Sequence, residues 1–200
     1  MRCNIKIYGL TGSSGAGKST AAAYFLPYHF GSVDADAVYR KICVPGSALL
    51  GELQAAFGDI LNPDGSLNRP ALASIVFSDA DKLKALNTIT CSHIWTESQN
   101  EFDRLEQRGI TQVLFDAPTL FQVGLNVHCH AVIGVIAPRE MRIARIMKRD
   151  GLTEQAAAAR IDAQPDNDFY RRHCDFILEN QGDSQALAAQ VHALCQTLQA

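Results

Sequence analysis

The chain has 200 residues, of which 47% are hydrophobic and 20% are charged, and its formal net charge is −3 at pH 7. This length and apolar content suit a single globular domain with a sizeable core, and no apolar run approaches the ~20 residues that a membrane-spanning helix needs. The small acidic excess argues against a protein held to nucleic acid or to an anionic membrane by bulk charge.

Six cysteines lie scattered along the chain without a C-x-x-C pair. In a chain of this length such cysteines are typical of reduced thiols that pack as small apolar side chains. The first residues contain neither a long apolar stretch nor a small-residue cleavage site. We therefore expect a soluble cytoplasmic protein, a monomer or a small homo-oligomer, with no nucleic-acid or membrane partner.

Short apolar runs alternate with helical patterns near both ends of the chain. Strands are expected at residues 4–10, 31–33, 111–115, 131–136 and 176–178, and helices at 18–26, 139–149, 154–163 and 184–198. Such runs suit strands that are buried on both faces of a parallel sheet. The section from about 47 to 108 is almost all helical, with a turn through Pro63, Asp64 and Gly65 in the stretch 62–77. This order predicts an α/β core that carries a helical insertion between its second and third strands.

A glycine-rich turn joins the first expected strand to the first expected helix. Residues 12–19 read GSSGAGKS and fit the pattern G-x-x-x-x-G-K-[ST] in the strand–turn–helix context that a P-loop requires. Backbone N–H groups of such a loop and of the following helix form a nest for phosphate. Lys18 can reach the β- and γ-phosphates, and the Ser19 hydroxyl can ligate Mg²⁺. The pattern indicates a nucleoside triphosphate site with magnesium, against the alternative of an ordinary glycine-rich turn. The expected nucleotide-binding residues of this stretch are Gly12, Ser13, Ser14, Gly15, Ala16, Gly17, Lys18, Ser19 and Thr20.

Two aspartates, Asp34 and Asp36, follow the second expected strand in the stretch FGSVDADAVYR. Ligands of a parallel sheet gather at the carboxyl ends of its strands, so both carboxylates would point toward the P-loop. One could orient and deprotonate an acceptor hydroxyl while the other helps to hold metal-bound water. The structural alternative is that Asp34 caps a helix that begins near Ala35. Motifs that read guanine or mark a transport ATPase are not present, which favours a kinase.

Three arginines, Arg142, Arg145 and Arg149, step by three and four residues after the fourth expected strand, and Arg160 lies on the next helix. One helical face would then carry three guanidinium groups. Two basic helices joined around Asp150 and Gly151 predict a mobile lid over the phosphates. The alternative is a solvated charged face.

Beyond the P-loop, the order and spacing of several short segments resemble the dephospho-CoA kinase family over about residues 5–182. The segments are GLTGSSGAGKST, VDADAVYR, LNRPALASIVFSD, LNTIT, PTLF, R-DGLT, RIDAQ and CDFILEN-G. The resemblance implies transfer of a phosphoryl group from ATP, with Mg²⁺, to the ribose 3′-hydroxyl of dephospho-CoA. It also implies a P-loop NTPase core with a parallel five-stranded sheet flanked by helices, a helical substrate-binding insertion and a lid.

The resemblance also implies roles for particular residues. Asp36 would be the base at the acceptor hydroxyl with Asp34 beside it, and Arg145 would stabilise the transferring phosphoryl group together with Lys18. Asn180 would lie near the ATP adenine. The expected substrate side consists of Asp34, Arg40, Leu67, Asn68, Arg69 and Pro118. The nucleotide-binding core would comprise residues 1–40, 109–138 and 174–200, the CoA-binding insertion 41–108 and the lid 139–165, all within a single P-loop kinase domain.

Four positions depart from the family pattern. Cys91-Ser92 stands where the family usually has His-Pro. The segment PTLFQ, with Thr119 and Gln122, replaces the family's P-L-L-F-E. His130 follows Cys129 at a position where an aspartate is common, and Ser13-Ser14 stands where Gly-Ile is common. The first three concern the acceptor side more than the nucleotide. The changes at Cys91-Ser92 and Gln122 leave a catalytically silent ATP-binding regulator as one alternative function. Another is a shikimate- or nucleoside-kinase-like enzyme, since shikimate kinases also carry Asp-x-Asp after the second strand.

Overall fold

The computed structural model describes residues 5–199, and within this range a parallel five-stranded sheet forms the centre of the molecule. Its strands are β1 (Lys6–Thr11), β2 (Phe30–Asp34), β3 (Gln112–Asp116), β4 (Ala131–Ile136) and β5 (Phe176–Glu179). Their order across the sheet is β2-β3-β1-β4-β5, and every pairing is parallel. The predicted α/β class is confirmed, and Asn4, where the first strand was predicted to begin, lies outside the described residues.

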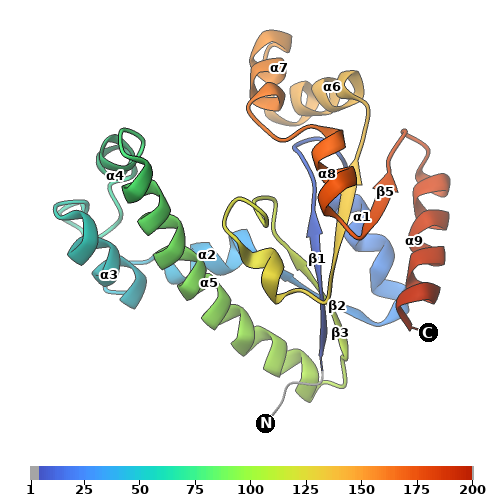
Figure 1. Ribbon diagram of the computed structural model, residues 1–200, viewed down its shortest axis with the longest axis horizontal. Coiled ribbons are helices and arrows are strands. Elements are labelled where there is room, and N and C mark those ends of the chain that lie inside the picture. Colours follow the sequence, from blue (N-terminus) through green and yellow to red (C-terminus); the bar gives the residue numbers. More distant parts are fainter. Residues whose placement is uncertain (1–4, 200) are drawn as a thin grey trace.

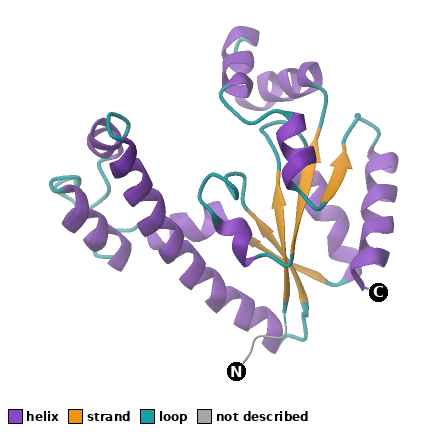
Figure 2. Cartoon of the chain, in the orientation of Figure 1, coloured by secondary structure: helices purple, strands orange, loops and turns teal. Residues whose placement is uncertain are grey.

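Helices cover both faces of this sheet (Figures 1 and 2). Because successive side chains of a strand point to opposite faces, Leu114 joins the core with α1 (Lys18–Phe25) and α9 (Ser184–Gln199). Its neighbours Val113 and Phe115 join the core on the other face, with Phe102 of α5 (Ala80–Gln107). Within the described residues, the 3₁₀ turn η1 (Leu26–Tyr28) precedes β2 and the 3₁₀ turn η2 (Leu125–His128) precedes β4. The strands are thus buried from both sides, as their uninterrupted apolar runs predict.

The predicted helical insertion consists of α3 (Ala48–Phe57), α4 (Arg69–Val76) and the 28-residue α5, and it extends to one side of the sheet (Figure 1). It has its own apolar cluster, which includes Leu53, Ile60 and Leu72. The predicted turn through Pro63, Asp64 and Gly65 separates α3 from α4, and there Gly65 N donates to Asn62 O (2.9 Å). Asn68 then caps α4 by accepting from Ala71 N.

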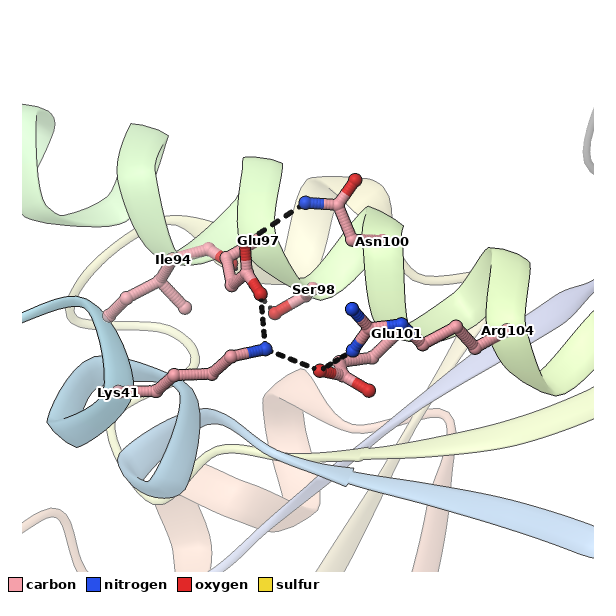
Figure 3. Close-up of polar contacts among 7 residues, drawn as sticks. All are labelled: Lys41, Ile94, Glu97, Ser98, Asn100, Glu101 and Arg104. Carbon is pink, nitrogen blue, oxygen red and sulfur yellow. Dashed lines mark hydrogen bonds and ion pairs between the residues drawn. The ribbon is translucent and has the colours of Figure 1, made fainter. Parts of the chain in front are cut away.

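The helix α8 (Asn167–His173), which precedes β5, was not predicted. The helix α2 (Ala35–Ile42) follows β2 directly and was expected only in the alternative in which Asp34 caps a helix. Lys41 near the end of α2 donates to Glu97 (2.5 Å) and Glu101 (2.8 Å) of α5, and Arg104 donates to Glu101 as well (2.7 Å; Figure 3). These contacts join α2 to the longest helix of the insertion.

The segment after β4 contains α6 (Arg139–Asp150) and α7 (Glu154–Asp162), which stand beyond the carboxyl ends of the strands (Figure 1). These two helices share a small apolar cluster of Ile143, Ile146, Ala157 and Ile161. None of the helices within residues 5–199 combines the length and the apolar character that a membrane span requires.

Candidate active site

A cavity of about 580 Å³ opens at the carboxyl ends of β1 and β3. Its walls come from the P-loop, from the turn after β3 and from residues between α6 and α8. The predicted site residues Lys18, Asp36, Arg145 and Arg149 all line it. Residues separated by more than 120 positions therefore meet around one space, at the sheet edge where α/β proteins bind ligands.

The P-loop has the backbone geometry that its glycines predict. Gly15 and Gly17 adopt φ values of 77° and 100°, and a Cβ at Gly17 would lie 2.0 Å from Asn180 Nδ2. A side chain at that position is excluded by both conformation and space. Gly17 is the residue before α1, and no side chain caps this helix, so its first N–H groups remain available to an anion in the cavity.

Lys18, the lysine of the P-loop, forms an ion pair with Asp116, the last residue of β3. Burial raises the pKa of the Asp116 carboxyl, and the Lys18 ammonium acts against that rise. Sequence reasoning missed Asp116. The available signal was its position: it ends an apolar strand, VLFD, that lies beside β1, so its carboxylate reaches the same sheet edge as the P-loop.

Asp34 and Asp36, at the end of β2 and the start of α2, have different contacts. Asp34 is the N-cap of α2, where its Oδ1 accepts from Asp36 N (2.8 Å) and Ala37 N (3.1 Å). The structural alternative for Asp34 is therefore correct, and its Oδ2 lies 3.8 Å from Arg40. Asp36, in the first turn of α2, is exposed and lines the 580 Å³ cavity. The cap thus fixes the turn of helix that presents Asp36.

A second cavity, of about 370 Å³ and mostly apolar, lies between α4, α5 and the turn after β3. Asp36, Pro118 and Thr119 line both cavities, so the two spaces meet at these residues. The other predicted substrate-side residues that line it are Leu67 and Arg69, whereas Arg40 lines neither cavity as formed by residues 5–199.

The three stepped arginines face the P-loop but differ in environment. Arg142 is 3% exposed and its Nε donates to the Ser14 carbonyl (3.1 Å), so this guanidinium is buried against the P-loop and does not lie on a solvated face. Arg145 Nη1 donates to the carbonyls of Gly15 (3.0 Å) and Ala16 (3.3 Å). Arg149 is exposed and pairs with Asp150.

Asn180, at the end of β5, is buried against the outer side of the P-loop. Its Nδ2 donates to the Ala16 carbonyl (2.8 Å), and its Oδ1 accepts from Arg145 Nη2 (3.0 Å). Asn180 and Arg145 therefore hold the same part of the loop, although their sequence positions are 35 residues apart.

The positions that depart from the family pattern also have defined places. Cys91 is buried and lines the apolar cavity, where burial raises the pKa of its thiol to about 11. Gln122 lines the larger cavity. His130 accepts from Ile7 N through Nδ1 (3.0 Å) and so satisfies a backbone donor of β1.

Comparisons with known proteins agree with this arrangement. A model of the family "Dephospho-CoA kinase" matches residues 6–186. The dephospho-CoA kinase of Anaeromyxobacter dehalogenans is 38% identical over 191 residues, which cover 95% of this chain and 90% of that protein. That of Corynebacterium efficiens is 37% identical over 187 residues, covering 93% and 94%.

Solved structures are similar over nearly the whole chain. A protein from Thermus thermophilus superposes with a TM-score of 0.79 at 32% identity, covering 97% of this chain and 98% of that one. Dephospho-CoA kinase from Campylobacter jejuni gives a TM-score of 0.64 at 26% identity, covering 96% of each chain. Shikimate kinase from Acinetobacter baumannii, at 17% identity and a TM-score of 0.52, shares the fold.

Proposed function

The chain belongs to the dephospho-CoA kinase family, and from this premise we propose how its residues transfer the γ-phosphoryl group of ATP to the ribose 3′-hydroxyl of dephospho-CoA. The observation that carries the proposal is the position of Asp36 at the junction of two cavities. One is polar and built on a phosphate-binding loop, and the other is largely apolar and lies against the helical insertion.

On the donor side, the P-loop N–H groups and the N-terminus of α1 bind the phosphates of ATP. Lys18 lies at the head of α1 and its ammonium neutralises charge on the β- and γ-phosphates. Asn180 and Arg145 hold the loop from outside. We assign Asn180 to the adenine end of the nucleotide because it contacts Gly17 and follows β5, at the opposite edge of the sheet from β2, which Asp36 follows.

On the acceptor side, Asp36 accepts a hydrogen bond from the 3′-hydroxyl and aligns its oxygen with the γ-phosphorus. As the new O–P bond forms and the bond to ADP breaks, the proton of the hydroxyl passes to the Asp36 carboxylate. An ordinary carboxylate with a pKa near ~4 is a weak base, but this reaction depends mainly on positioning and charge neutralisation. The pantetheine arm of the substrate then occupies the apolar cavity beside Leu67, Arg69 and Pro118.

Magnesium fits the donor set at this site. Mg²⁺ takes oxygen ligands and is usually held by one or two carboxylates together with substrate phosphates and water. Ser19, which lines the cavity, supplies a hydroxyl oxygen, and Asp116, which pairs with the cavity-lining Lys18, supplies carboxylate oxygens. When bound, the ion would offset the charge that develops on the β- and γ-phosphate oxygens.

We propose that Arg145 stabilises the transferring phosphoryl group, and its place in the cavity lining, on α6, supports this role. Its guanidinium donates to the P-loop carbonyls of Gly15 and Ala16, so it must release one of these bonds to reach the γ-phosphoryl. We propose the lid for residues 139–165, with Arg149 at its tip and Arg142 at its base. The insertion 41–108 binds the CoA portion, and residues 1–40, 109–138 and 174–200 form the nucleotide core of a cytoplasmic enzyme.

The test is ADP release by the purified protein with ATP and Mg²⁺, measured with and without dephospho-CoA. The proposal predicts a large increase with dephospho-CoA and the appearance of coenzyme A by mass spectrometry. Shikimate, uridine, cytidine and their monophosphates serve as alternative acceptors in the same assay. A larger increase with one of these would reassign the acceptor, and ATP binding without release under any condition would indicate a silent regulator.

A further inference from the structure

The apex of the P-loop is held by residues that lie more than 120 positions later in the chain. Ser14 has the densest set of contacts: its N–H donates to Gln164 Oε1 (2.9 Å), and its hydroxyl oxygen accepts from Gln164 Nε2 (3.1 Å). Its carbonyl accepts from Arg142 Nε (3.1 Å). All the polar groups of Ser14 are therefore bonded to the 139–165 segment.

Arg142 and Gln164 approach Ser14 from opposite ends of that segment. Arg142 lies in the first turns of α6, and Gln164 follows the end of α7 by two residues. Gln164 N also donates to the Ile161 carbonyl (3.0 Å), so its backbone is fixed to the last turn of α7. The helices between these two anchors pack on one another through the Ile143–Ile161 cluster. A displacement of α7 must therefore displace the Gln164 carboxamide from Ser14.

The far end of the same segment carries charge that faces the phosphate cavity. Arg149 lines the cavity and pairs with Asp150 (2.7 Å), while Arg160 Nη1 donates to Asp150 Oδ2 (2.7 Å). Since Arg160 keeps Asp150 paired, Arg149 can turn toward a phosphate without leaving the carboxylate alone. The position of this tip relative to the phosphates then depends on where the base of the segment is fixed.

We propose that Gln164 is a positioning residue for phosphoryl transfer: its carboxamide, bonded to both the N–H and the hydroxyl of Ser14, sets where the 139–165 segment closes over the γ-phosphate. The inference rests on the proposed function for its kinetic consequence. The inference also gives the Ser14 hydroxyl a role, because an apolar residue at this position could not accept the hydrogen bond from Gln164 Nε2. Gln164 itself lines the cavity, so an action through Ser14 must be distinguished from direct contact with phosphate.

A double-mutant cycle makes that distinction. Gln164→Met keeps the length of the side chain and removes both bonds, whereas Ser14→Ala removes one. We expect Gln164→Met to lower kcat about 10- to 100-fold, since small misplacements have effects of this size, with the KM for dephospho-CoA within about twofold. Ser14→Ala should itself lower kcat, by less than Gln164→Met, and the double variant should match Gln164→Met alone, because both changes break the same contact. An unchanged kcat in Ser14→Ala would indicate direct contact of Gln164 with phosphate and would overturn the inference. If the losses in kcat of the two single variants multiply in the double variant, or if KM changes with constant kcat, the inference is overturned.

Gln155→Met, at an exposed glutamine on α7, is the matched control and should behave as the unchanged chain.

A second measurement needs no acceptor. Trypsin cleavage after Lys148 and Arg149 reports opening of the segment in the presence of a non-hydrolysable ATP analogue. Loss of both hydrogen bonds to Ser14 predicts cleavage of Gln164→Met at least about fivefold faster than of the unchanged chain, and equal rates would overturn the inference. If the unchanged chain fails to phosphorylate dephospho-CoA, the proposed function fails, and the trypsin measurement alone then decides the role of Gln164.

Discussion

Lys18 at the head of α1, which lines the larger cavity, forms an ion pair with Asp116 at the end of β3, and only the sheet brings these two elements together. The Lys18 ammonium is thereby held at the floor of the site before any nucleotide arrives. The pair also places a carboxylate oxygen beside the lysine that we propose contacts the β- and γ-phosphates. Two predictions follow from this carboxylate, one on activity and one on pH.

Asp116→Asn should lower kcat by about 100-fold or more, because it removes a preorganised negative charge that fixes Lys18 and fits a magnesium ligand. The expected accompanying change is a higher Mg²⁺ concentration for half-maximal rate. A titration of ADP release with MgCl₂ measures both kcat and the Mg²⁺ concentration for half-maximal rate. A variant with the unchanged chain's Mg²⁺ dependence would remove Asp116 from the metal's surroundings and leave it only the pairing with Lys18.

The pH dependence of stability should report the same carboxyl. Burial raises the pKa of Asp116 in the folded chain, despite the opposing Lys18. A carboxyl with a raised pKa in the folded state binds its proton more tightly there than in the unfolded state. The free energy of unfolding therefore falls as pH rises from the unfolded pKa, near ~3.9, through the folded pKa, where the proton is lost. The unchanged chain should therefore lose stability relative to Asp116→Asn as pH increases from 4 to 7. Urea unfolding of both proteins across this range gives the difference, and a gap that widens in the opposite direction contradicts the prediction.

Asp36→Asn should retain ATP binding and lose turnover by at least about 100-fold, because the amide cannot accept the acceptor's proton. The matched control is Asp34→Asn, the same change two residues earlier, which keeps an effective N-cap for α2. The control should keep most of the activity. Comparable losses in the two variants would show that the pair acts through the helix rather than through one base.

Some of this site could be predicted from the sequence because the signals are local. The P-loop needs glycines at fixed positions between a strand and a helix, and all of these requirements appear within residues 7–25. Strand runs buried on both faces predicted the parallel sheet. Asp36 could be placed at the site because it follows a strand directly. The resemblance to a family supplied the acceptor, which no local pattern contains.

Other features depend on contacts between distant segments and left no local signal. Asp116 meets Lys18 only because β3 lies beside β1 in the sheet, and a lone aspartate after an apolar run is common. Arg142 and Arg149 belong to one charged stripe, yet the first is buried against Ser14 and the second is exposed. The short helix α8 lacks the length over which a 3.6-residue period can be read.

Arg145→Lys should lower kcat by about 100-fold, since a lysine cannot bridge the Gly15 and Ala16 carbonyls and the Asn180 amide at once or spread its charge over a phosphoryl group. The affinity for ATP should fall less than kcat. Stopped assays over a range of ATP concentrations separate the two quantities. Arg139→Lys on the same helix, whose guanidinium pairs with Asp162 outside this cavity, should leave both within about twofold.

Phe77→Ala should weaken the binding of dephospho-CoA without changing the chemical step. Phe77 follows α4, lines the apolar cavity and is 77% exposed, so the free chain leaves most of the surface of this residue to be covered. Burying a phenylalanine contributes roughly 1.5–3 kcal/mol, so the KM for dephospho-CoA should rise by about tenfold or more while kcat at saturation and the KM for ATP stay constant.

Val127→Ala, at an apolar residue that is 74% exposed and away from this cavity, should change neither constant. Because the exposed ring adds little to the folded core, the melting temperature of Phe77→Ala should match that of the unchanged chain. A KM rise accompanied by a lower melting temperature would instead indicate that the loss arises from the insertion's own packing.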